Sequence, residues 1–249
     1  MSGVIDIRGV EFSYPDGRKV LHGVDLEITA GERVAILGPN GAGKTTLALH
    51  LNGILQPHAG TITVCGIPVV GEHYREVRRM VGLVFQDTND QLFMPTVRED
   101  VAFGPANLGL KGEALDRRVD AALEVVSGSE LADRPPHHLS GGEKRRAALA
   151  TVLSMEPEVL VFDEPTSGLD PAGRRELILT LADLPMTQLV ITHDLPLALE
   201  LCPRSVIMNR GRVVADVPTS DLLDSPDVLA DNRLELPYGF DRSGDALSS

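Results

Sequence analysis

The chain has 249 residues, enough to bury a core as one large domain or as two lobes. Its 36 acidic and 23 basic residues give a net charge of -13, which argues against nucleic-acid binding and against direct attachment to anionic lipid. The spacing of Cys65 and Cys202 fits neither a metal site nor a disulfide framework, so we expect reduced core thiols. No apolar run reaches the roughly 20 residues that cross a bilayer, so any membrane role requires a partner.

Strand-like and helical patterns alternate along most of the chain. Strands are predicted at 4–10, 24–28, 33–37, 61–64, 81–85, 159–162, 188–191, 205–208 and 212–215. Helices are predicted after Gly43, at 113–126, after Ser140, after Pro171 and at 195–201. This alternation favours an α/β fold with a mostly parallel sheet covered on its faces.

The interval from about 88 to 155 shows helical and loop patterns without a strand pattern. We therefore expect it to form a helical subdomain inserted into a sheet domain that spans residues 1–225. Residues 226–249 form a tail rich in Asp, Pro and Ser, and its end is expected to be disordered.

A glycine-rich stretch, GPNGAGKTT, lies between the predicted strand RVAIL and the helix TTLALHL. It fits the phosphate-loop pattern G-x-x-x-x-G-K-[ST] at every fixed position. In such a loop, backbone N–H groups surround the β-phosphate, Lys44 reaches the β- and γ-phosphates, and the Thr45 hydroxyl ligates Mg²⁺. The alternative, a chance glycine turn before a helix, does not account for the strand–loop–helix context. The predicted nucleotide-binding residues are Gly38, Pro39, Asn40, Gly41, Ala42, Gly43, Lys44, Thr45 and Thr46.

Two further apolar runs end in polar residues that suit ATP hydrolysis. VLVFDE ends in Asp163, expected to hold the Mg²⁺ shell, and Glu164, expected to act as general base on the attacking water. LVITHD ends in His193, which could hydrogen-bond the γ-phosphate. The alternatives are a turn cap before Pro165 for the acids and a structural strand-end residue for the histidine.

A second glycine-rich turn, LSGGEKRR, precedes another predicted helix. Ser140 and Glu143 match the capping box S-x-x-E, which explains the helix start but not Gly141 and Gly142. A bare helix N-terminus with a serine hydroxyl suits a γ-phosphate. On a separate lobe this turn is expected to face the nucleotide of a second, similar subunit, so that each chain forms half of two sites. The predicted signature turn comprises Leu139, Ser140, Gly141, Gly142 and Glu143.

Two nearby features are expected to be ordinary surface. His137 and His138 lie in a loop without a carboxylate or cysteine at ligand spacing, so we interpret them as surface residues rather than as a metal site. The charged run from Glu143 to Arg146 is interpreted as a solvated helix face rather than a nucleic-acid patch.

GPNGAGKTT, LSGGEKRR, VFDEPTSGLD and ITHD, in this order and spacing, resemble the nucleotide-binding subunit of ABC transporters over nearly the whole chain to about residue 225. The resemblance implies a P-loop ATPase fold with an antiparallel β subdomain and an inserted helical subdomain. It also implies ATP and Mg²⁺ between two subunits of a head-to-tail dimer. By the same resemblance Tyr14 is expected to stack on adenine, Gln86 to touch Mg²⁺ and the water, and Asp170 to cross the dimer interface. An ordinary strand-end tyrosine is the alternative for Tyr14. Glu143 stands where Gln is commoner, and we expect a modest effect on rate.

The stretch from Phe85 to Leu110 resembles the ATPases of energy-coupling-factor (ECF) importers, which carry Q-[DN]-P-[DE]-[DN]-Q-[LI] there. Asp90, Gln91 and Leu92 match, whereas Thr88 and Asn89 replace Pro and an acid. In that branch the segment helps to receive helices of a transmembrane coupling subunit, which works with a substrate-binding membrane subunit. The alternative is that Leu92, Phe93 and Val101 pack the core of the helical lobe.

The ending LELPYGF resembles the cobalt and nickel branch, so we expect an ATPase that powers cobalt or nickel import from the cytoplasmic face of the cell membrane. A vitamin such as biotin is the alternative cargo. A soluble ABC ATPase that acts on DNA or ribosomes is disfavoured by the acidic balance and the single compact domain. A nucleotide-binding switch that does not hydrolyse ATP is disfavoured, because Glu164 and His193, the residues expected to act in hydrolysis, are both present.

Overall fold

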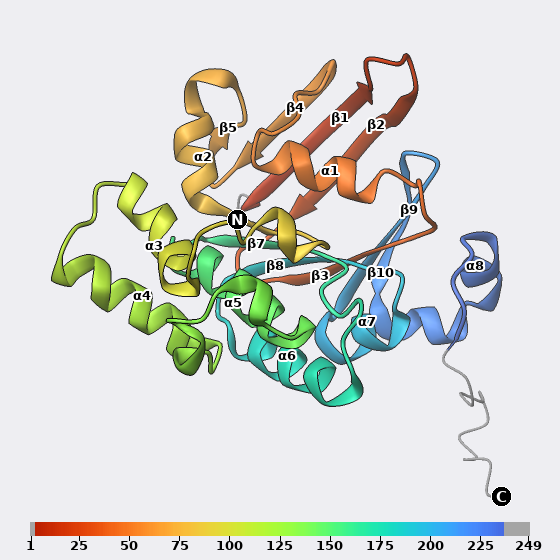
Figure 1. Cartoon of the computed structure of the whole chain (residues 1–249). Coiled ribbons are helices and arrows are strands. Elements are labelled where there is room, and N and C mark those ends of the chain that lie inside the picture. Colours follow the sequence, from red (N-terminus) through yellow and green to blue (C-terminus); the bar gives the residue numbers. More distant parts are fainter. Residues whose placement is uncertain (1–2, 237–249) are drawn as a thin grey trace, which may run out of the picture. The chain divides into compact units, whose positions relative to one another are not determined.

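The computed structural model describes residues 3–236 (Figure 1). The chain divides into two compact units. The terminal unit comprises the residues up to Val77 together with those from Thr187 onward, and the central unit is Arg78–Met186. The expected tail end and most of the LELPYGF ending lie outside the described residues. No helix within residues 3–236 combines the length and the apolar character needed to cross a membrane.

The terminal unit contains an antiparallel sheet of order β2-β1-β4-β5 with α1 packed beside it (Figure 1). Apolar residues alternate along β1 and face the core, as expected for a half-buried strand. A bulge at Gly9, with φ 57°, shifts the register between Ile7 and Val10, and the Gly9 N–H donates to Asp25 at 2.8 Å. The elements are β1 (Ile5–Ser13), β2 (Lys19–Ile28), α1 (Lys44–Leu51), β4 (Ala59–Val64), β5 (Ile67–Pro68) and α2 (Tyr74–Met80), which runs into the central unit.

The same unit holds a second set of strands in the order β10-β9-β3-β8. β3 is parallel to both β8 and β9, while β10 runs antiparallel to β9. The RVAIL and TQLVI runs are almost continuously buried, as strands covered on both faces require. These elements are β3 (Arg33–Leu37), β8 (Thr187–Ile191), α7 (Leu195–Leu201), β9 (Arg204–Asn209), β10 (Arg212–Pro218) and α8 (Pro226–Asp231).

The central unit combines one parallel strand pair with a group of α-helices. β6 and β7 pair in register from Val81↔Val159 to Val84↔Phe162, and both strands are fully buried. α3, α4 and α5 pack against one another, as Figure 1 shows in green. The elements are β6 (Val81–Val84), α3 (Val97–Asn107), α4 (Glu113–Val125), α5 (Gly141–Leu153), β7 (Val159–Asp163) and α6 (Pro171–Asp183).

These elements confirm the predicted α/β class, with mostly parallel strands and a separate antiparallel sheet. The sequence patterns missed α3, because Gly104 and Pro105 near its end weaken the helical signal. A capping box formed by Thr96 and Glu99 starts that helix. Cys202 is buried as expected, but the expectation for Cys65 was wrong, because it is half-buried in a turn at φ 50°.

Candidate functional site

The phosphate loop, Gly38 to Thr46, runs from the end of β3 into the first turn of α1 in the terminal unit. Two of its glycines cannot be replaced without a clash. A Cβ at Gly38, which has φ 138°, would lie 2.0 Å from the carbonyl oxygen of Met208 in β9. A Cβ at Gly43, at φ 101°, would lie 2.9 Å from Leu21. The glycines therefore let the loop backbone approach its neighbours closely and also supply the left-handed conformations.

The Lys44 side chain folds into this loop. Its Nζ donates to the carbonyl oxygens of Gly38 at 2.6 Å and Pro39 at 3.1 Å, and the residue is only 7% exposed. α1 begins at an N-cap glycine, Gly43, and carries no acidic residue in its first turn. The Lys44 ammonium group, held beside the positive N-terminal end of a helix, is suited to binding a phosphate.

Tyr14 and His193 also belong to the terminal unit. The Tyr14 hydroxyl shares a hydrogen bond of 3.2 Å with Thr46 Oγ1, and Arg18 lies over the tyrosine ring at 5.5 Å. His193 is exposed and follows β8, which runs parallel to β3. The carboxyl ends of parallel neighbours share one sheet edge, so the fold places His193 on the edge from which the phosphate loop starts.

Asp163, Glu164 and Gln86 lie at the carboxyl ends of the same strand pair in the central unit. Asp163 ends β7, Gln86 follows the end of β6, and these parallel strands share a carboxyl edge. Asp163 and Glu164 are 7% and 9% exposed, whereas Gln86 is exposed. Glu164 adopts φ 47°, a left-handed conformation that costs a non-glycine residue about 1–2 kcal/mol and that concentrates at functional sites.

The signature turn starts α5 with the predicted capping box. Ser140 Oγ accepts from the Glu143 N–H at 3.3 Å, and a Glu143 carboxylate oxygen accepts from the Ser140 N–H at 2.7 Å. Ser140 and Gly141, at the start of this turn, are both exposed.

A hollow of about 790 Å³ in the central unit brings this turn together with Asp170. Asp170 caps α6 by accepting from the Gly173 N–H at 2.7 Å. Residues 140–143 and 168–170 line the hollow along with one side of α6. The predicted partner-facing residues, which lie 30 positions apart in the sequence, therefore share one surface.

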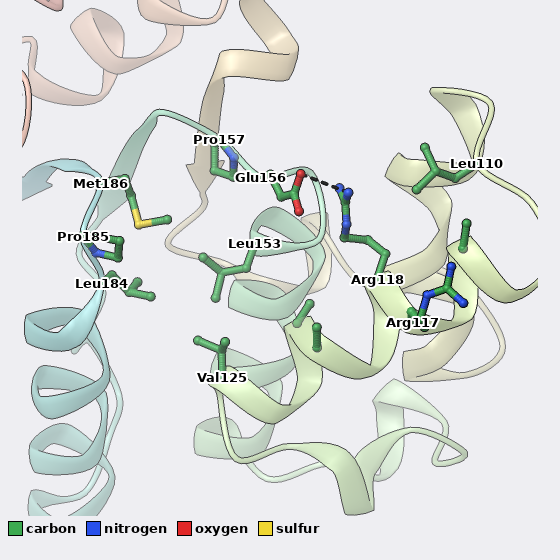
Figure 2. A pocket seen from close by; sticks show the side chains of 13 residues that line it. Leu110, Arg117, Arg118, Val125, Leu153, Glu156, Pro157, Leu184, Pro185 and Met186 are labelled. Atoms are coloured by element: carbon green, nitrogen blue, oxygen red, sulfur yellow. Dashed lines mark ion pairs between the residues drawn. The ribbon is translucent and has the colours of Figure 1, made fainter.

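A second hollow, of about 580 Å³, lies elsewhere in the central unit. Figure 2 shows its apolar lining, which includes Leu153 and Met186, and the ion pair of 3.0 Å between Arg118 and Glu156. It contains no predicted site residue.

The structure corrects one expectation about the charged run after the signature turn. Arg145 does not lie on a solvated face, because it is 5% exposed and donates to the carbonyl oxygens of Phe85 at 2.8 Å and Gln86 at 3.0 Å. Sequence reasoning missed this contact, and it also missed Arg134, whose Nη1 lies 2.5 Å from the Glu143 carboxylate. Neither contact has a local sequence signal, since each depends on how separate segments pack.

The residues predicted to ligate Mg²⁺ carry suitable donor atoms. The hydroxyl of Thr45, the amide oxygen of Gln86 and the carboxylate of Asp163 are hard oxygen ligands, which Mg²⁺ prefers. Across residues 3–236, no cluster of three or more His, Cys, Asp or Glu side chains is arranged to hold a metal ion. His137 and His138 are both exposed, and their rings lie 4.3 Å apart.

The family model and the similar proteins point to the same family. Residues 21–167 match the family model described as ABC transporter. A putative ABC transporter ATP-binding protein of Streptomyces coelicolor is 61% identical over 95% of this chain and 91% of its own length. An energy-coupling factor transporter ATP-binding protein of Methanospirillum hungatei is 46% identical, covering 94% of this chain and 86% of its own.

Solved structures agree with this similarity. The cbiO1 protein of Clostridium perfringens, part of the ABC transporter complex cbiONQ, has a TM-score of 0.82 and 37% identity over 95% of this chain and 97% of its own. A dimeric ATP-binding cassette in a post-hydrolysis state with ADP and Pi has a TM-score of 0.77 and 27% identity over 86% and 98% of the two chains. The chain therefore belongs to the ABC transporter family, as an ATP-hydrolysing subunit of the energy-coupling-factor type.

Proposed function

We propose that two such subunits clasp ATP between them, each offering its signature turn to the nucleotide on the partner's phosphate loop. The observation that carries this proposal is the exposed, Cβ-free start of α5, which shares a hollow with Asp170. A helix N-terminus with a serine hydroxyl is a phosphate site. The similar cassette that is dimeric with bound ADP and Pi supports a dimer that holds nucleotide. The second subunit is either an identical chain or a homologue.

Within each site we assign the hydrolytic roles to strand-end residues. Glu164 acts as general base on the attacking water, and it follows the end of β7 in a left-handed backbone conformation. His193 donates to the γ-phosphate and holds the water. Thr45, Gln86 and Asp163 would hold Mg²⁺, which neutralises charge on the phosphates when bound.

Tyr14 is proposed to stack on the adenine ring. Its hydroxyl contact with Thr46 places the aromatic ring beside the phosphate loop. Aromatic side chains offer such a face to any flat base. Asp170 caps α6 in this structure. It is proposed to reach the partner's phosphate loop across the dimer interface.

Mixing two inactive variants tests the shared site. Lys44→Ala should abolish ATP binding or hydrolysis, and Ser140→Arg should block the partner's site. A mixed dimer of the two retains one intact composite site, so ATPase activity should recover to a fraction of wild type. Activity is measured after mixing differently tagged, full-length subunits and isolating the mixed dimers. No recovery in dimers shown to be mixed would refute the shared site.

We further propose that the subunit powers an ECF-type importer at the cytoplasmic face of the membrane. Phe93 and Phe103 form an edge-to-face pair at 5.1 Å and are 61% and 44% exposed, whereas Leu92 and Val101 are buried core residues. An exposed aromatic pair that follows the Gln86 segment suits a docking surface for the transmembrane coupling subunit. The substrate-binding membrane subunit completes the complex.

Cobalt or nickel is the proposed cargo, with a vitamin such as biotin as the alternative. The resemblance of the chain's ending to the cobalt and nickel branch supports a metal-ion cargo. The cargo would pass through the membrane subunits, while this subunit handles ATP and Mg²⁺.

A further inference from the structure

The carboxylate of Glu143 lies inside the turn that is proposed to receive a phosphate. Its pKa is lowered to about 2, first by the backbone N–H of Ser140, then by the Ser140 hydroxyl and by Arg134. Glu143 is therefore ionised at neutral pH. An ionised carboxylate beside a triphosphate repels it and competes for the hydroxyl proton that Ser140 would donate.

Arg134 meets this carboxylate directly. Its Nη1 lies 2.5 Å from Glu143, and its Nη2 donates to the carbonyl oxygen of His138 at 2.9 Å. His138 ends the 3₁₀ turn that leads into the signature turn. One guanidinium therefore joins the residues before the turn to the acid within it.

The other basic side chains of this helix start have partners elsewhere. Lys144 donates to Asn89 at 3.0 Å, and Arg146 pairs with Glu130. Arg145 is turned to the carbonyl oxygens of Phe85 and Gln86.

We infer that Arg134 is a positioning residue for ATP hydrolysis, one that neutralises Glu143 and orders the signature turn for the partner's γ-phosphate. The inference rests on the proposed function of the turn. It explains how Glu is accepted where a neutral Gln is commoner, since the ion pair restores a near-neutral turn.

A double-mutant cycle tests the inference in the full-length chain. Arg134→Gln should raise the KM for ATP about tenfold, the size of one charge-assisted hydrogen bond. In a Glu143→Gln background the same change should cost less than about twofold, because the charge to be neutralised has gone. Arg134→Lys, which keeps the charge, should retain most of the affinity for ATP. Added salt should reduce the rise in KM that Arg134→Gln causes.

Controls separate the possible failures. Arg117→Gln removes another surface ion pair of the central unit, 3.5 Å from Glu113, and should leave the KM unchanged. An equal penalty for Arg134→Gln in both backgrounds, or no penalty at all, would overturn the inference. If Ser140→Arg keeps wild-type activity, the proposed function itself fails. Should Arg134→Gln not fold, the comparison of Arg134→Lys with wild type across salt concentrations decides the question.

Discussion

Glu164 combines a strained backbone conformation with a proposed role as general base. It occupies a left-handed conformation at the end of a fully buried strand, immediately before Pro165. Nothing in a carboxylate side chain favours this backbone, so the surrounding packing of β7 must hold it. Such strain is expected where a side chain must point away from its strand toward a reacting group.

We predict that Glu164→Gln keeps ATP binding but stops hydrolysis, because the amide cannot accept the proton of the attacking water. The variant should accumulate as an ATP-bound dimer. Size-exclusion chromatography with ATP and Mg²⁺, together with a phosphate-release assay, measures both effects. Asp183→Asn, at the end of α6, is a matched control for the loss of one acid. Hydrolysis at the wild-type rate would show that another group is the base.

At the scale of elements, α5 is bound to the segment that follows β6 by side chains from both. Arg145 on α5 donates to Phe85 and Gln86, and Gln91 donates to the Ala148 carbonyl and the Thr151 hydroxyl, both at 2.7 Å. The helix that carries the signature turn therefore also supports the backbone of Gln86.

Replacing Arg145 by Met should destabilise the protein by about 2–3 kcal/mol, because two carbonyl oxygens lose a charged, largely buried donor. It should also lower kcat, because the backbone of Gln86 loses its support. Urea unfolding and steady-state ATPase assays measure the two effects. Arg117→Met, on a side chain that is 73% exposed, should change stability by less than about 0.5 kcal/mol. A fully stable and active Arg145→Met variant would contradict this role.

At the scale of the whole molecule, the residues proposed to act on ATP are divided between the two units. The terminal unit holds Tyr14, the phosphate loop and His193, and the central unit holds Gln86, Asp163, Glu164 and the signature turn. The proposed roles in ATP hydrolysis are therefore assigned to residues of both units, and each signature turn is proposed to act on the partner chain's nucleotide.

Coupling to the membrane can be tested through the aromatic pair on the central unit. Phe93→Ser should reduce co-purification with the transmembrane coupling subunit and reduce ATP-driven uptake into vesicles, since an exposed anchor is lost. Uptake is measured separately for cobalt, nickel and biotin. Ile54→Ser, at a residue that is 48% exposed in the terminal unit, is the matched control. Undiminished co-purification and uptake would exclude Phe93 from the docking surface.

Local motifs were predictable because their geometry is determined by adjacent residues. The phosphate loop lies between β3 and α1, and the capping box of α5 forms between Ser140 and Glu143. The buried strands followed from continuous apolar runs, which only a sheet covered on both faces accommodates. α3 was missed because its packing overrides the weak local preference of Gly104 and Pro105.

The sequence by itself determined the family, the α/β class and which residues are candidates for nucleotide chemistry, because ordered short motifs carry their own local backbone geometry. Only the tertiary structure decided what surrounds those motifs. It paired Arg134 with Glu143, buried Arg145 against a segment about 60 residues away, and placed Asp170 in the same hollow as Ser140. Such contacts depend on how helices pack, and packing is set by the whole core rather than by any contiguous stretch.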